Sequence, residues 1–531
     1  MTAELSPRDR TFAFVGILLA LFLGALDQTI VATALPRIVD DLGGVSRYAW
    51  VATVYLLAST VMVPIYGRLA DLISRRTIEL VAVITFLAGS FLCGLAGEFG
   101  ELPGVGDGMN QLIVARAIQG LGGAGLFAMA FIVIADLFPP RDRGRYQGFV
   151  GAVFGVASIL GPLAGGVLTD HGGAIIPGIE GWRWVFYVNV PFGALALWFI
   201  VRRMPPLVPR AGGRFDVLGA ILLVGGVTPL VLALQLDRTV HAWLGRTTLG
   251  LLAMALLMLG VFGARAARSE HPLLDPALFR NRVFATSSLA LFLLGGAFMG
   301  LVVYLPLFLV NVVGVTATGA GAAMIPLSLG VVVGSTVSGQ LVSAWGRYKP
   351  FMIGGAVLLA VAVFLLTTMD ADTSARRATF YMVLCGLGIG PAMPLFTLAI
   401  QNDVDSRRLG QATSASQFFR QIGGTAGAAA MGSMLALGLA DAVTQGAESP
   451  AVFAAALRPV FQIALLLSAA GAVAALFVPE LPLRRHFEPT PGRGTSVGAN
   501  DEGPPDGVGI AETDSLDGKR ADTAPVDSNL R

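Results

Sequence analysis

Long apolar runs separated by short polar segments dominate the chain from residue 12 to residue 478. A helix needs about 20 consecutive apolar residues to cross the hydrocarbon core of a membrane. Runs of that length predict fourteen membrane-spanning helices, near 12–35, 49–67, 78–97, 111–138, 147–169, 183–201, 217–236, 247–264, 284–310, 319–341, 350–369, 377–400, 409–437 and 457–478. The pattern therefore predicts an all-α polytopic membrane protein.

Composition agrees with this class and argues against an enzyme. The chain has 531 residues, of which 55% are hydrophobic and 13% charged, whereas a soluble protein carries about 25% charged residues. Cys93 and Cys385 lie inside apolar runs, and the four histidines are scattered, so no metal or catalytic cluster is predicted. The sequence has no phosphate-binding loop of the G-x-x-x-x-G-K-[ST] type, which disfavours ATP-driven transport by this chain.

The positive charge indicates an orientation. An even number of spans places both termini on one side, and arginine is concentrated in the loops on the side of the N-terminus, for example Arg75, Arg76, Arg141, Arg143 and Arg145. Because positive loops stay inside, both termini are expected in the cytoplasm and the protein in the cell (inner) membrane. The first apolar run, about 24 residues long, exceeds the core of a signal peptide, so it is interpreted as a retained helix.

A sequence repeat divides the chain into two halves. Gly67, Leu69 and Arg75 recur as glycine, leucine and arginine 272 positions later, and the same offset relates the first helix to the ninth. The predicted domains are a cytoplasmic N-terminus (1–11), a six-helix bundle (12–201), a linker with two extra helices (202–283), a second six-helix bundle (284–483) and a disordered cytoplasmic tail (484–531). Repeat-built membrane proteins bind substrates and ions between their repeats, which favours a transporter.

An acidic residue lies deep in the first apolar run. Asp27 comes nine residues before Pro36, about 13 Å below the end of its helix at a rise of 1.5 Å per residue. Arg116, in the fourth run, is expected about 8 Å below the same face, within reach of Asp27. Because a charge at membrane depth costs about 2.5–3.5 kcal/mol, such residues face a cavity and find partners. We expect Asp27 to carry a coupled proton and Arg116 to modulate it; the alternative is a purely structural ion pair.

Several motifs carry a family resemblance. The chain resembles the fourteen-helix drug:proton antiporters of the major facilitator superfamily, which implies the fold of two six-helix bundles plus two inserted helices. The motifs are Leu26-Asp27-x-Thr29-Ile30-Val31, Gly67-x-Leu69-Ala70-Asp71 with Arg75-Arg76, Arg116-Ala117-Ile118-Gln119-Gly120, Gly161-Pro162-Leu163-Ala164-Gly165-Gly166 and Phe419-Arg420-Gln421-x-Gly423-Gly424.

The resemblance implies a conformational charge cluster. Asp71 and Arg75 are four residues apart, the spacing of neighbours on one helical face, and Asp136 is a candidate partner for Arg75. The resemblance implies that these residues latch the outward-open state and that Asp71 faces the N-terminus of the helix at 409–437, which favours a carboxylate. The alternative is that the arginines only determine topology.

The resemblance also assigns an antiporter motif to the fifth helix, formed by Gly161, Pro162, Gly165 and Gly166. Proline removes a backbone donor and kinks a helix, and glycines permit close helix contact. The helix is therefore expected to bend or seal against its neighbours during transport, with simple close packing as the alternative.

The predicted function is proton-coupled antiport that exports lipophilic or amphiphilic small molecules, that is, multidrug efflux. A lipid or other amphiphile exporter of the same fold is the alternative within the family, and a non-transporting membrane receptor is the alternative outside it. The expected energy source is the proton gradient, and no cofactor is expected. The expected partners are small lipophilic substrates, protons and membrane lipids, with no nucleic acid. The protein is expected to be a monomer. Candidate cavity residues are Tyr55, Gln119, Phe154, Phe292, Met299, Phe418 and Gln421.

Overall fold

The computed structural model describes residues 6–44, 47–174, 176, 178–206, 213–236, 241–315, 323–444 and 449–483. All of these belong to one compact unit, and within them the regular structure is helical, without a β-strand. Fourteen helical stretches in this part of the chain are long and apolar enough to cross a membrane. The predicted all-α polytopic membrane fold is confirmed.

The helices fall into two similar series. The first consists of α1 (Pro7–Leu42), α2 (Tyr48–Leu72), α3 (Arg75–Gly94), α4 (Gly108–Leu137), α5 (Pro140–His171) and the pair α6 (Trp184–Tyr187) and α7 (Asn189–Arg203). Next come α8 (Val217–Gln235) and α9 (Arg246–Ala266). The second series consists of α10 (Arg282–Asn311), α12 (Ile325–Trp345), α13 (Lys349–Thr367), α14 (Ala375–Asp403), α15 (Leu409–Thr444) and α16 (Pro450–Leu476).

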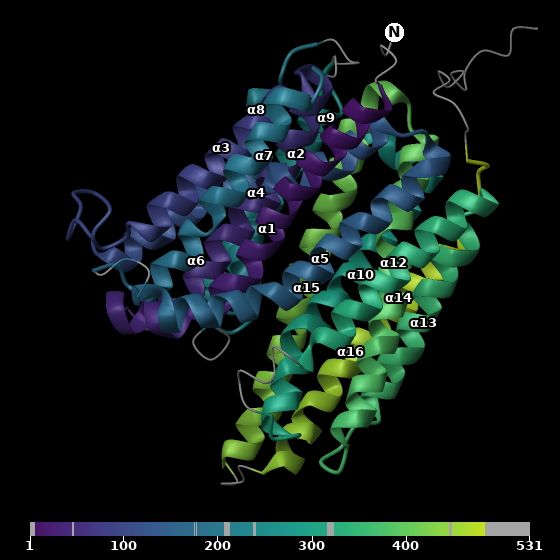
Figure 1. Cartoon of the computed structure of the whole chain (residues 1–531). Helices are drawn as coiled ribbons and strands as arrows, with labels where there is room; N and C mark the ends of the chain where they lie inside the picture. Colours follow the sequence, from purple (N-terminus) through teal and green to yellow (C-terminus); the bar gives the residue numbers. More distant parts are fainter. Residues whose placement is uncertain are drawn as a thin grey trace, which may run out of the picture. The chain divides into compact units, whose positions relative to one another are not determined.

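Each series packs into a bundle of its own. Contacts among α1 to α7 and among α10 to α16 dominate, while α8 and α9 contact one another and α8 also reaches α2 and α15 (Figure 1). The two extra helices are therefore an inserted hairpin beside the bundles. The predicted tail at 484–531 and the first five residues of the predicted N-terminal segment lie outside the described residues.

The two bundles meet along α5 with α12 and along α2 with α15. Glycines bring these backbones together near the end of the bundles at which α1 begins, called here the N-terminal end. A Cβ on Gly144 of α5 would lie 3.2 Å from the carbonyl oxygen of Gly339 on α12. A Cβ on Gly67 of α2 would overlap the side chain of Ser414 on α15. Small residues thus close the N-terminal end by backbone contact.

Buried polar groups strengthen this closure. The amide of Gln147 on α5 donates to Oε1 of Gln401 on α14 over 2.9 Å. Gln401 in turn donates to the carbonyl of Phe131 on α4 over 3.2 Å, and its own carbonyl accepts from Arg143 over 3.2 Å. Because all four residues are buried, these bonds form without competition from water, and opening this end would break them.

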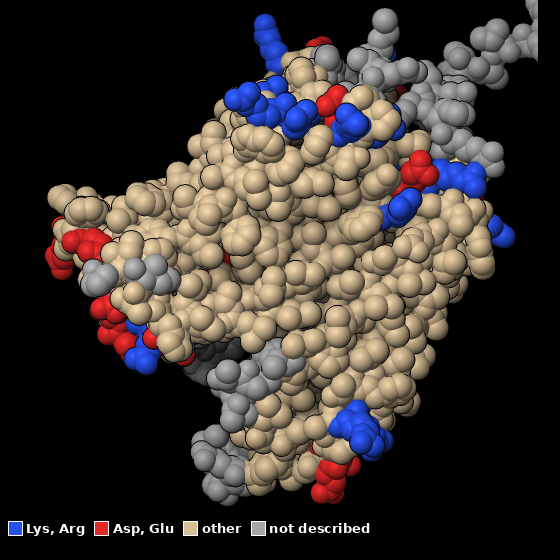
Figure 2. Space-filling view, viewed as in Figure 1, with Lys and Arg blue, Asp and Glu red and all other residues tan. Residues whose placement is uncertain are grey.

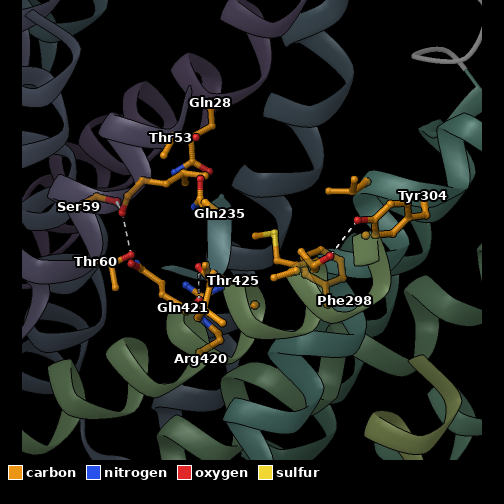
Figure 3. A pocket seen from close by; sticks show the side chains of 18 of the residues that line it. Gln28, Thr53, Ser59, Thr60, Gln235, Phe298, Tyr304, Arg420, Gln421 and Thr425 are labelled. Atoms are coloured by element: carbon orange, nitrogen blue, oxygen red, sulfur yellow. Dashed lines mark hydrogen bonds between the residues drawn. The ribbon is translucent and has the colours of Figure 1, made fainter. Parts of the chain in front are cut away.

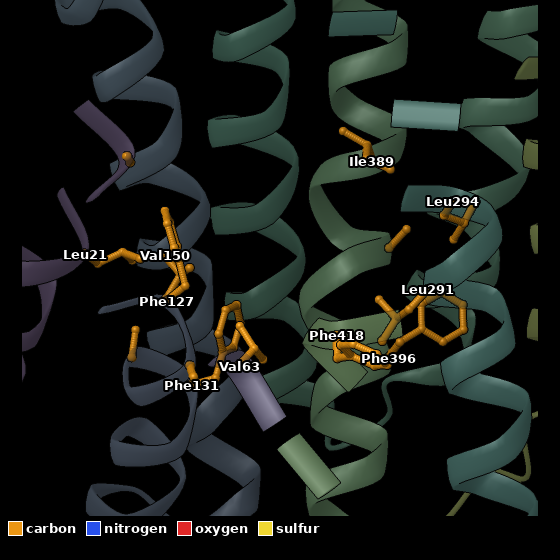
Figure 4. Packing of buried hydrophobic residues seen from close by; sticks show 14 of the residues in the cluster. Leu21, Val63, Phe127, Phe131, Val150, Leu291, Leu294, Ile389, Phe396 and Phe418 are labelled. Atoms are coloured by element: carbon orange, nitrogen blue, oxygen red, sulfur yellow. The ribbon is translucent and has the colours of Figure 1, made fainter. Parts of the chain in front are cut away.

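Each bundle has an apolar core, and the two cores lie on either side of the interface between the bundles. Phe127 and Phe131 of α4 pack in the first bundle with Val150 of α5, and Phe396 and Phe418 pack in the second (Figure 4).

The molecular surface carries its charges at the ends. In Figure 2 most lysines and arginines on the visible face gather at the N-terminal end, above a wide band almost without charge. This distribution is typical of a protein that spans a membrane.

Several helices extend beyond the predicted spans, among them α1 and α5. The sequence predicted that the first helix ends before Pro36, but α1 continues through Pro36 to Leu42. Ile38 in this extension is fully buried, so packing compensates for the hydrogen bond that proline cannot donate. Likewise α5 begins at Pro140, before the predicted residue 147, and continues unbroken through Pro162. Proline at the first position of α5 is compatible with a helix because that N–H has no helical partner.

Candidate functional site

The centre of the first bundle contains a buried ion pair. Nη1 of Arg116 on α4 donates to Oδ2 of Asp27 on α1 over 2.6 Å. Asp27 is fully buried and Arg116 is 2% exposed. The predicted proximity of these two residues is therefore present in the structure, and the pair joins two helices far apart in sequence.

Polar neighbours complete the environment of Asp27. Gln119, one turn after Arg116, donates to Oδ1 of Asp27 over 2.8 Å and accepts from Arg116 over 2.7 Å. Asn189, the first residue of α7, donates to the same Oδ1 over 3.2 Å and to the hydroxyl of Ser90 over 3.0 Å. The carboxylate thus accepts three hydrogen bonds from two helices.

Arg116 has partners besides the carboxylate. Its Nε donates to the carbonyl of Val51 over 3.3 Å, and its Cζ lies 4.3 Å from the ring centroid of Tyr55. A guanidinium over an aromatic face is stabilised by the ring quadrupole. Arg116 is therefore held in place by groups that remain when the charge of Asp27 changes.

A second charge cluster lies at the N-terminal end. Nε of Arg75 donates to Oδ2 of Asp136 over 2.8 Å, and Nη2 of Arg75 lies 3.9 Å from Asp71. Asp71 accepts hydrogen bonds over 2.9 Å from the backbone N–H groups of Gly410 and Gln411, at the start of α15. The carboxylate therefore caps a helix of the opposite bundle, where the helix dipole favours negative charge.

The fifth-helix motif contacts α1 close to Asp27. A Cβ on Gly161 would overlap the hydroxyl of Thr29, and one on Gly165 would overlap that of Thr33. Thr29 also donates a hydrogen bond to the carbonyl of Ala157 on α5 over 3.0 Å. Gly161 and Gly165 therefore allow α5 to lie directly against α1. Gly166, in contrast, has nothing within 4 Å of its would-be Cβ, so the predicted close contact does not form there.

A cavity of about 640 Å³ lies between the bundles, lined by α1, α2, α4, α5, α8, α10 and α15. This volume suits a drug-sized molecule. Gln28, the neighbour of Asp27, lines it from α1, and Figure 3 shows Gln235, Thr60 and Gln421 around the same opening. Phe298 of α10 adds apolar surface.

The predicted cavity residues occupy different places, and only three of them line the cavity. Phe154, Met299 and Gln421 line this cavity. Gln119 and Tyr55 belong instead to the surroundings of the Asp27–Arg116 pair, and Phe418 is buried in the core. Phe292 packs against α15 through its backbone, where Gly423 approaches it. The rotation of each helix, which one sequence does not determine, decides between these positions.

Several residues with a place in the site were not among the predicted site residues. Asn189 contacts Asp27 from α7, and Gln28 and Arg420 line the cavity. Each stands as a polar residue inside a long apolar run, which is a detectable signal for a site, but its partner lies on another helix. Outside these residues, Glu79 of α3 is also fully buried, and neither of its carboxylate oxygens has a hydrogen-bond partner within the described ranges.

The geometry defines a class of protein: a polytopic membrane protein of two bundles, with a buried ion pair beside a cavity between them. Comparison with known proteins identifies the family. The model of the Major Facilitator Superfamily matches residues 17–428, so the chain belongs to that superfamily.

Its relatives include named multidrug transporters. The chain is 40% identical over 435 residues to multidrug transporter protein MdtP of Bacillus subtilis (strain 168), covering 82% of this chain and 77% of that protein. It is 38% identical over 433 residues to multidrug resistance protein 3 of the same organism, covering 82% and 81%. The crystal structure of the human organic anion transporter MFSD10 (TETRAN) matches with a TM-score of 0.60 and 16% identity, over 86% of this chain and 99% of that one. At this identity the structural match bears on the fold alone.

Proposed function

We propose that the chain is a proton-coupled antiporter that exports amphiphilic small molecules by alternating access. The observation that carries this proposal is a buried, fully hydrogen-bonded carboxylate next to a residue that lines a cavity between two bundles. Asp27 supplies the carboxylate and Gln28 the cavity residue. The multidrug names of the two bacterial relatives support the same class of substrate.

Protonation of Asp27 is the proposed coupling step. In a poorly screened interior the attraction between two charges at 2.6 Å is strong, so a proton on Asp27 removes a main link between α1 and α4. Arg116 keeps Gln119, the carbonyl of Val51 and the ring of Tyr55 as partners. We therefore expect the loss of this link to release α1, and with it Gln28, rather than to displace Arg116.

The charge cluster at the N-terminal end is the proposed latch. Asp71 ties the end of α2 to the start of α15, and Gln147 ties α5 to α14. With these bonds formed, the cavity is cut off from the N-terminal end, which corresponds to an outward-open state if the termini are cytoplasmic. Return to the inward-open state requires that both ties break. The contact of Gly161 with α1 is the proposed seal against leak.

The remaining assignments follow from this scheme and are part of the proposal. The protein resides in the cell (inner) membrane with both termini in the cytoplasm, supported by the arginines of the N-terminal end. It acts as a monomer, draws on the proton gradient without a cofactor and performs no catalysis.

The proposal is tested with the purified full chain in proteoliposomes. Movement of a panel of fluorescent amphiphiles, covering cations, neutral molecules and anions, is measured with and without an imposed pH gradient. We expect gradient-dependent accumulation that Asp27→Asn abolishes and Asp27→Glu partly retains. Transport of every substrate without gradient dependence would overturn the antiport assignment, and full activity of Asp27→Asn would remove Asp27 from the coupling step.

A further inference from the structure

The cavity between the bundles carries a single kind of charge. Among the described residues that line it, Arg420 of α15 is the only charged one; the rest are apolar or neutral polar. None of the described lining residues carries a carboxylate. Asp27, next to the lining residue Gln28, is fully buried and engaged by Arg116. The described lining therefore offers a cation at membrane depth without a counter-ion among its own residues.

Arg420 is only partly satisfied by the protein. Its Nε donates to Oε1 of Gln417, one turn earlier on α15, over 2.9 Å. Within the described chain it forms no ion pair, whereas the buried Arg75 and Arg116 have carboxylates at 2.8 and 2.6 Å. Because a guanidinium has five N–H donors in a planar fork, Arg420 has capacity for a further acceptor.

The local structure holds Arg420 at the cavity. Gly295 of α10 lies against the backbone of Arg420, where a Cβ would overlap the carbonyl oxygen, so the two helices pack closely at this level. Figure 3 shows the side chain beside Gln421 and Thr425, on the side of the cavity opposite Gln28. Phe298 lines the same cavity and supplies apolar surface. The site thus combines one fixed charge with polar and apolar surface.

We propose that Arg420 binds the acidic group of the transported molecule, so that the preferred substrates are amphiphilic organic acids with a carboxylate or sulfonate. This inference rests on the proposed transport function and names its substrate class. A guanidinium pairs with two oxygens of a carboxylate or a sulfonate through two parallel hydrogen bonds, and this pairing is strongest where water is excluded. A lipophilic cation would instead meet a positive charge without an ion-pair partner, and no carboxylate among the lining residues that the structure describes.

The size of the cavity favours a small organic acid over a lipid. About 640 Å³ accommodates a drug-sized molecule, whereas a phospholipid with two acyl chains is larger. Both sources present the same acidic chemistry to Arg420, so the experiment includes an arm that separates them.

Binding is measured with three dansyl amphiphiles that share one alkyl chain and end in a carboxylate, a methyl ester or a primary amine. The full chain is placed in phosphatidylcholine nanodiscs, dansyl emission reports binding, and empty nanodiscs are the blank. Charge-assisted hydrogen bonds predict that the acid binds about ten-fold or more tightly than the ester, and the amine most weakly. An amine that binds as tightly as the acid would overturn the proposal.

Variants assign the preference to one side chain. Arg420→Gln is expected to weaken binding of the acid about ten-fold or more without changing binding of the ester. Arg420→Lys keeps the charge but not the fork, so it should retain part of the preference, and it serves if the glutamine variant does not fold. Arg377→Gln on α14, an exposed arginine that lies over Tyr381, is the matched control and should behave as the unchanged protein. An unchanged acid preference in both Arg420 variants would exclude this residue.

The lipid arm repeats the titration in phosphatidylglycerol nanodiscs. The ratio of acid affinities between the unchanged protein and Arg420→Gln should be the same in both lipids. Loss of that ratio in phosphatidylglycerol would mean that a lipid headgroup occupies Arg420, and would overturn the assignment to a small acid. None of these measurements uses a pH gradient. Failure of gradient-driven transport would therefore refute the proposed function and leave the binding result standing.

Discussion

For the Asp27–Arg116 pair we predict that substitutions affect the stability of the protein and its gradient-driven transport differently. Asp27→Asn removes the carboxylate from a buried guanidinium, and Arg116→Gln removes the guanidinium from a fully buried carboxylate. Breaking a buried ion pair by removing one partner typically costs about 3–5 kcal/mol, because the other charge stays buried and unpaired. For Asp27→Asn we expect the lower end of this range, since Arg116 keeps Gln119, Val51 and the ring of Tyr55. For Arg116→Gln we expect the upper end, because only neutral amides remain to compensate Asp27.

The double variant distinguishes a structural pair from a coupling site. With both charges gone no unpaired ion remains, so the double variant should be less destabilised than the sum of the two single variants. Thermal unfolding of the four proteins in detergent, followed by size-exclusion chromatography, measures this. Gradient-driven transport in proteoliposomes should stay absent in the double variant even where stability returns. Additive losses of stability would refute the ion pair, and recovered coupling in the double variant would refute the role of Asp27 as proton carrier.

Three further predictions concern the rest of the protein. Arg347 lowers the pKa of Glu480 through two hydrogen bonds. Because this pKa is lowered on folding, the pair stabilises the folded protein above a pH of about 4.5. The difference in unfolding temperature between the unchanged protein and Arg347→Gln should therefore vanish as the pH falls through the lowered pKa. Gly67→Ala should separate α2 from α15 and widen the distance between spin labels at the start of α5 and the end of α12, which both lie at the N-terminal end of the bundles. Gly166→Ala, which has open space, should leave this distance unchanged. Glu79→Met removes a buried carboxyl without a hydrogen-bond partner in the described part of the chain, and should leave the unfolding temperature unchanged or raise it; a clear decrease would reveal a partner.

Some contacts were predictable because local sequence restricts them. Asp71 and Arg75 are four residues apart, so their proximity follows from helix geometry. The depth of Asp27 and Arg116 follows from counting residues to the predicted helix ends. This count places them about 5 Å apart in depth, a gap that an arginine side chain closes. The contact of Asp71 with the start of α15 was expected only from the family resemblance, because the two segments are more than three hundred residues apart.

Other contacts depended on helix rotation. Gln119 and Tyr55 were expected in the cavity but surround the ion pair, because α4 and α2 turn these positions toward α1 and toward Arg116. Gly166 follows Gly165 in the same motif, yet only Gly165 meets α1, since successive residues of a helix point about 100° apart. The continuation of α1 through Pro36 was likewise decided by tertiary packing of the residues beyond it.

The sequence by itself determined the membrane class, the fourteen spans and the presence of charges that a membrane does not tolerate without partners. These properties depend on the membrane as solvent and on the length of each apolar run, so each segment can be judged by itself. Only the tertiary structure decided which side chains share the cavity, and that Arg420 is the charged residue among the described ones that line it. The physical reason is that helix rotation and pairing are set by packing between distant segments, where a small change in angle exchanges a core position for a cavity position.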